Sequence, residues 1–190
     1  QEDAPRPRGG AGCWIPLILS LLIAAALIGV GLFLPPVNLY QRLFGTQYVM
    51  LDAASNAIAS DGFTLVLDPA DTGAAFGVAL KSLSVSEFVT PTQTDTPAML
   101  AGMRATLPPY LAPSGSVYTL DTTGTAPRTV TLTLDVPADV TARDLLDLYA
   151  YRDGAWVFVP SQPTVDGKIS AQVDGVPQAV TLVQASALDP

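Results

Sequence analysis

Acidic side chains are the residues of this chain whose spacing comes closest to a chemical site. In the segment from Asp68 to Gly73, Asp68 and Asp71 could offer two carboxylates to a calcium ion. Calcium takes roughly six to eight oxygen ligands, and the segment lacks the further acids of an established calcium loop. Asp, Pro and Gly are also ordinary turn formers. The sequence therefore favours a plain loop, with Asp68 and Asp71 as the calcium candidates.

A second acidic group surrounds Pro137 and consists of Asp135, Asp139, Asp144 and Asp147. Glycosidases use pairs of carboxylates, one as acid and the other as base or nucleophile. No aromatic-rich sugar cleft accompanies these residues, and Asp is seldom buried. We interpret them as solvated acids of turns and strand edges.

Two shortages narrow the chemistry further. The chain has no histidine, which removes Ser-His-Asp and Cys-His catalysis and imidazole metal sites. Cys13 is the single cysteine, so no intrachain disulfide and no cysteine-based zinc site can form. The net charge of −8 disfavours a nucleic-acid partner. The sequence thus predicts a protein that is not an enzyme and needs no cofactor.

Four aromatic residues, Tyr149, Tyr151, Trp156 and Phe158, flank Asp153-Gly154. Asp-Gly between two apolar runs is a strong hairpin signal. Since alternate strand positions face opposite sides, we expect one set, Tyr149 with Tyr151 or Trp156 with Phe158, to lie mostly in the core. The outward half of the hairpin is the predicted interaction surface, suited to a protein partner or to stacking on cell-wall glycan.

The longest apolar run begins at Trp14 and continues without a charge to Leu34. At 1.5 Å per residue it would span about 31 Å, close to the hydrocarbon core of a lipid bilayer. The sequence predicts a transmembrane helix over 14–34. Trp14 and Tyr40 are the expected interfacial anchors, and Pro16 fits the first helical turn.

Charges near this run set the predicted orientation. Arg6 and Arg8 precede it and Arg42 follows it, which favours a cytoplasmic N-terminus and an extracytoplasmic remainder in the cell membrane. A cleavable signal peptide is the main alternative to this signal anchor. Cys13 is either a plain interfacial residue or a site of S-acylation.

The predicted domain organisation follows from this pattern. Residues 1–13 are a short cytoplasmic tail, 35–60 a juxtamembrane connector, and 61–90 a first β segment. Residues 91–115 are a Pro/Thr-rich linker around a short helix near 99–105. In 116–190, short strands separated by Gly, Pro and Asp predict a β-sandwich. The expected fold class is mostly β.

The C-terminal part also resembles a known type of domain. The residues that carry the resemblance are Leu107-Pro108, Ser116 to Tyr118, Leu132 to Pro137, Leu145 to Tyr151, Asp153 to Trp156, Val159-Pro160 and Pro177 to Val180. They look like the ZU5-type, immunoglobulin-like β-sandwich that follows a signal anchor in large predicted envelope proteins of Chloroflexota bacteria. Some ZU5-related domains cut themselves at a His-Phe-Ser type site, which a chain without histidine does not share.

Three functions remain open at this point. The first is a membrane-anchored structural or assembly protein of a bacterial cell envelope, which displays its β-sandwich as a stalk or interaction module. The second is a glycan-binding or glycan-processing envelope protein. The third is an accessory single-helix subunit of a membrane complex.

Overall fold

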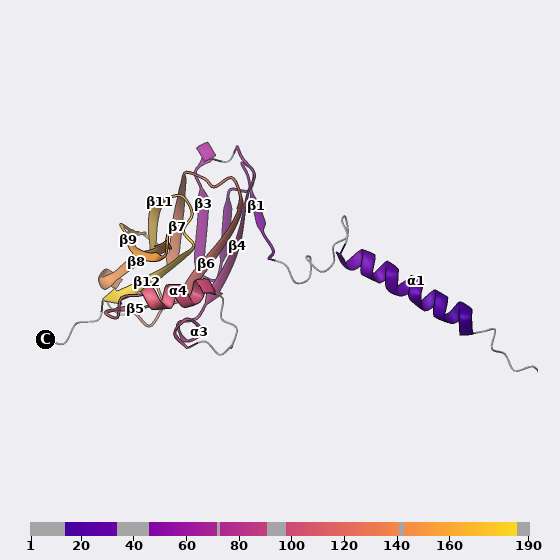
Figure 1. The fold of residues 1–190 in the computed structure, drawn as a ribbon. Coiled ribbons are helices and arrows are strands. Elements are labelled where there is room, and N and C mark those ends of the chain that lie inside the picture. The colour runs from indigo at the N-terminus through magenta and orange to yellow at the C-terminus, as the bar shows by residue number, and fades with distance from the viewer. Residues whose placement is uncertain (1–13, 34–45, 72, 91–97, 141–142, 186–190) are drawn as a thin grey trace, which may run out of the picture. The chain divides into compact units, whose positions relative to one another are not determined.

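The computed structural model describes residues 14–33, 46–71, 73–90, 98–140 and 143–185. It divides into two units, residues 1–47 and residues 48–190. In the first unit, helix α1 covers Trp14–Phe33. We call the described part of the second unit the β-domain (Figure 1).

The prediction of a transmembrane helix is contradicted. Over the described residues, no helix combines the length and the apolar character that a bilayer crossing requires. The membrane-anchoring roles expected for Trp14, Pro16, Leu34 and Tyr40 stay predictions, because the side chains of these residues lie outside the described part of the chain.

The β-domain contains two antiparallel sheets (Figure 1). The larger, sheet A, has the order β1-β4-β6-β12-β8-β9 with β5 beside β12. Its strands are β1 (Val49–Leu51), β4 (Phe76–Leu83), β5 (Leu111–Pro113), β6 (Val117–Gly124), β8 (Leu146–Arg152), β9 (Ala155–Val159) and β12 (Ala179–Ala185).

Sheet B has the order β10-β11-β7-β3-β2. Its strands are β2 (Ala57–Ser60), β3 (Phe63–Leu67), β7 (Thr129–Asp135), β10 (Gln162–Pro163) and β11 (Lys168–Asp174). Two 3-10 turns, η1 (Pro69–Asp71) and η2 (Arg143–Leu145), complete the loops. The alternation of buried and half-buried residues in β3 and β7 shows that one face of this sheet points inward.

The main core lies between the two sheets. Sheet B contributes buried side chains such as Leu65 and Leu132, and sheet A contributes Val78, Leu148 and Leu182. A turn of sheet B also reaches sheet A, because the hydroxyl of Tyr118 donates to the carbonyl oxygen of Asp61 at 2.6 Å. The domain is therefore mostly β, as predicted, and two facing sheets are compatible with the predicted β-sandwich.

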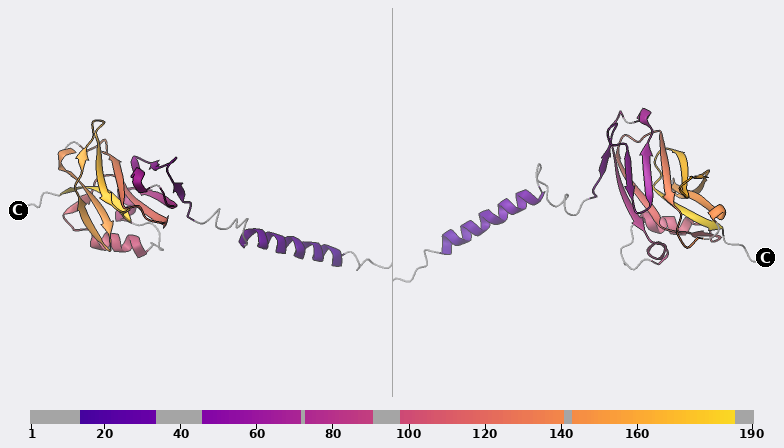
Figure 2. Two further views of the ribbon diagram at one scale, coloured as in Figure 1. Left: turned by 90° about the horizontal axis from the view of Figure 1, so that it is seen from above. Right: turned by 180° about the vertical axis from the view of Figure 1, so that it is seen from behind.

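A second, smaller core covers the opposite face of sheet A. It is built by two helices that the sequence pattern shows only weakly, α3 (Val85–Val89) and α4 (Ala98–Thr106). Ser84 and Glu87 form a complete capping box that begins α3. Arg104 of α4 donates to backbone carbonyls of α3 and lies 5.7 Å from the ring centre of Phe88. Figures 1 and 2 show α4 beside the strands of sheet A.

The segment expected as a linker, 91–115, thus carries α4 and β5 in its described part. Strand β5 pairs with β12 from Leu111 to Pro113. Helix α4 buries Met103 completely against sheet A. These contacts fix the position of the outer face of the β8–β9 hairpin, where the predicted interaction surface lies.

Candidate interaction surface

The β8–β9 hairpin forms where the Asp-Gly signal predicted it. Asp153 and Gly154 have φ angles of +50° and +83°, which is the pattern of a two-residue type I′ turn. The strands pair in register, with Tyr149 opposite Phe158 and Tyr151 opposite Trp156. Because directly opposite residues share a face, all four aromatic side chains lie on one side of sheet A.

This arrangement corrects the expected division of the aromatic residues. The pair on β8 (Tyr149 and Tyr151) and the pair on β9 (Trp156 and Phe158) do not point to opposite faces of the sheet. The four side chains share the face covered by α3 and α4, and they differ in burial along the hairpin instead. Tyr151 and Trp156 are buried near the turn, Tyr149 is half-buried, and Phe158 is 50% exposed.

Tyr151 and Trp156 serve as anchors for the helices. The indole Nε1–H of Trp156 donates to the carbonyl oxygen of Met103 at 2.7 Å, a buried hydrogen bond between β9 and α4. The Trp156 ring meets Phe88 edge-on at 6.3 Å and Tyr151 at 5.4 Å. The side chains of both residues are therefore structural.

Tyr149 and Phe158 form the accessible end of the hairpin. Their rings meet edge to face, with centres 5.9 Å apart and planes at 72°. Burial raises the pKa of Tyr149 above its usual value, and the nearby Asp147 and Tyr110 add to the shift. Tyr110 is itself 47% exposed. We call Tyr110, Tyr149 and Phe158 the aromatic patch.

Sequence reasoning missed Tyr110. It lies in the Pro-rich segment before β5, and its approach to the hairpin depends on the pairing of β5 with β12. A local pattern does not reveal that pairing, because the two strands are far apart in sequence.

Two grooves to which Phe158 contributes are lined by residues of both sheets. One is lined by residues that include Arg143, Asp147, Phe158 and Ile169. The other is lined by Arg152, Val157 and Phe158 of sheet A and by Gln172 to Asp174 of β11. Phe158 is the residue common to both linings.

The calcium candidates hold the loop together. A carboxylate oxygen of Asp68 accepts the N–H of Ala70 at 2.8 Å. Asp71 accepts the N–H groups of Arg128 and Thr129 at 2.6 and 3.0 Å. These bonds are turn and loop contacts. The residues that the structure describes include no group of three or more acidic or other metal-binding side chains.

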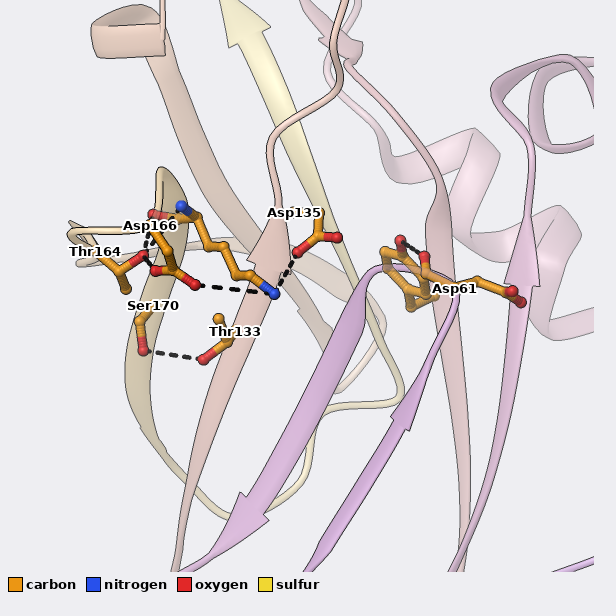
Figure 3. Close-up of polar contacts among 8 residues, drawn as sticks. Asp61, Thr133, Asp135, Thr164, Asp166 and Ser170 are labelled. Carbon is orange, nitrogen blue, oxygen red and sulfur yellow. Dashed lines mark hydrogen bonds and ion pairs between the residues drawn. The ribbon is translucent and has the colours of Figure 1, made fainter.

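The aspartates around Pro137 do not share a single set of contacts. Asp135 forms an ion pair with Lys168 at 3.0 Å, and Asp166 lies 4.0 Å from the same Nζ (Figure 3). The hydrogen bond and the charge of Asp135 raise the pKa of Lys168. Asp147 lies in β8 near the aromatic patch, and Asp139 is exposed. The exposed contacts around Lys168 give little stability.

The predicted anchors and acylation site are only partly described. Trp14 and Pro16 belong to α1, but their side chains fall outside the description, as do Cys13, Leu34 and Tyr40.

No protein-family model matches the chain, and no curated protein matches it either. The resemblance to ZU5-type domains of Chloroflexota envelope proteins therefore stays a prediction from the sequence.

Proposed function

We propose that the β-domain is a non-enzymatic assembly module that binds a protein partner through the aromatic patch. The observation that carries this proposal is the position of Phe158. Half of its side chain is exposed on a strand that is otherwise fixed by Trp156 and α4. Exposed aromatic groups on a rigid support are typical of binding surfaces, because little conformational entropy is lost on contact. A place in a bacterial cell envelope belongs to the same proposal and rests on the sequence resemblance.

The geometry favours a protein over a sugar as the partner. A sugar ring stacks best on a flat aromatic surface, whereas the rings of Tyr149 and Phe158 stand at 72° to each other. Such a pair offers an uneven aromatic surface instead of a flat one. An uneven apolar surface fits the side chains of a protein.

Site-specific photocrosslinking tests the proposal. A benzophenone amino acid replaces Phe158 in the full chain, and Met50 is replaced in a matched control. Met50 is 52% exposed and belongs to β1, at the opposite edge of sheet A. We expect a protein adduct from position 158 that is at least about tenfold stronger than from position 50.

The possible adducts separate the functions. A protein adduct, including one with a second copy of this chain, supports the proposal. An adduct that is removed by glycosidases and resists proteases would contradict protein binding and favour the glycan-binding function. Equal labelling from positions 158 and 50 would refute it.

A further inference from the structure

Strand β9 is an edge strand with unusual features. Among the described residues its one neighbour in sheet A is β8. It is five residues long, whereas the other edge strands, β1, β2, β5 and β10, have three, four, three and two residues. The strand reads Ala-Trp-Val-Phe-Val and has no charge, and Val157 and Phe158 are each 50% exposed. Natural edge strands usually carry charges, bulges or prolines that prevent pairing with another chain.

The free backbone groups of β9 can be assigned from the hairpin. The carbonyl oxygen of Tyr151 accepts from the N–H of Gln178, so it points toward β12 and away from β9. Tyr151 and Trp156 are therefore a pair without mutual hydrogen bonds. Since the pattern alternates, the N–H and C=O groups of Trp156 and Phe158 point to the free edge of the sheet.

We propose that the partner of this edge is a second copy of the chain, which pairs β9 with β9 antiparallel about a two-fold axis through Val157. This inference rests on the proposed assembly function and names its partner. In this register Trp156 of one copy lies opposite Phe158 of the other. Each of the two pairs exchanges both of its hydrogen bonds, which gives four bonds across the axis.

Other registers are less favourable for a physical reason. An axis through Phe158 would place Trp156 opposite Pro160, which has no N–H to donate. An axis through Trp156 would place Phe158 opposite Gly154, which is held in the turn at φ +83°. The axis through Val157 is the one that uses every outward donor and acceptor of the strand.

The side chains and charges fit the same register. With a two-fold axis perpendicular to the sheet, the same face of sheet A points the same way in both copies. The exposed Val157 side chains of the two copies therefore meet each other. Phe158 then lies beside Trp156 of the other copy, on the face of the aromatic patch. Asp153 comes opposite Ser161, so no acidic residues oppose each other across the axis. In a chain of net charge −8, this uncharged edge is suited to self-association.

Disulfide trapping tests the inference in the full chain, with Cys13 replaced by serine. The variant Val157→Cys places two thiols at a directly opposite pair without hydrogen bonds, where the Cα atoms are about 4.5 Å apart. That distance lies within the range of a disulfide. Two matched variants serve as controls. Phe158→Cys would have its Cα atoms about 8–9 Å apart, beyond disulfide range, and Val165→Cys is fully exposed and reports random collision.

We expect Val157→Cys to form dimers at least about tenfold faster than either control at equal protein concentration. Dimers from Phe158→Cys instead of Val157→Cys would overturn the register. Equal rates from all three variants would overturn the inference.

A second measurement does not depend on an introduced thiol. Sedimentation equilibrium compares the unaltered chain with Val157→Lys, with Val165→Lys as the control. We expect Val157→Lys to weaken self-association at least about tenfold, because two like charges would meet at the axis, and Val165→Lys to leave it unchanged. No difference among the three proteins would also overturn the inference. If thiol trapping fails while Phe158 still photocrosslinks a different protein, the assembly function stands and this partner does not.

Discussion

Replacing Trp156 with phenylalanine tests how the helices hold the hairpin. The change removes the hydrogen bond to the Met103 carbonyl, which is buried and 2.7 Å long. A buried bond of this kind contributes about 1 kcal/mol. The smaller ring also loses packing worth roughly one to two methylene groups, at about 0.8 kcal/mol each. We expect the free energy of unfolding to fall by about 2–3 kcal/mol.

Urea unfolding followed by far-ultraviolet circular dichroism measures this loss, since tryptophan fluorescence would change with the substitution itself. Phe158→Leu is the matched control. It shortens an aromatic side chain on the same strand, and this side chain is half-exposed and anchors no helix. We expect it to cost about 0.5 kcal/mol or less. Hydrogen exchange of the α4 amides provides a second readout and should accelerate in Trp156→Phe alone. A loss below about 0.5 kcal/mol with unchanged exchange in α4 would refute the anchoring role.

Three further predictions concern the framework of the β-domain. Tyr118→Phe keeps the ring but removes its hydrogen bond between the sheets, and should lower the free energy of unfolding by about 1 kcal/mol in urea titrations. Gly124→Ala should cost about 3 kcal/mol, because φ is +85° and a Cβ would overlap the carbonyl oxygen of Ala75. Gly154→Ala should cost about 1 kcal/mol, because φ is +83° but an added Cβ would meet no neighbouring atom. Equal losses of stability in Gly124→Ala and Gly154→Ala would contradict this reasoning. Hydrogen bonds from Ser84 within the capping box of α3 lower the pKa of Glu87 below 4.5. The Glu87 carboxylate therefore stabilises the fold above pH 4.5. This stabilisation is lost as the pH falls through the lowered pKa. The stability of the unaltered chain should therefore drop relative to Glu87→Gln below pH 4.5, and parallel pH profiles would contradict the role of the charge.

Local patterns predicted most of the longer strands of the β-domain and its Asp153-Gly154 turn, but not the short strands β1, β2, β5 and β10. The alternation of apolar residues located β3 and β7, and Asp153-Gly154 located the hairpin, because both signals depend on neighbouring residues. Within the predicted first β segment, the pattern of residues 76–89 indicates one long strand or two short ones. In the structure β4 ends at Leu83, and the capping box of Ser84 and Glu87 begins α3.

The long-range contacts of the candidate site were not predictable in the same way. The hydrogen bond from Trp156 to Met103 joins residues that are 53 positions apart in the sequence. Periodicity could show that the hairpin has two faces, but not that helices cover one of them. The burial of Tyr151 and Trp156, and the approach of Tyr110 to the hairpin, depend on those distant contacts.

The place of β12 in sheet A has a consequence for how the domain is made. This strand, the last described one in chain order, lies between β6 and β8 and also pairs with β5. During synthesis, β6 and β8 each lack a partner on one side until β12 has left the ribosome. The domain should therefore fold after translation of its final strand, by closure of long-range pairs, which is a slow class of folding. Until that moment the unpaired strands are open to other chains, so a nascent domain depends on chaperones more than its small size suggests.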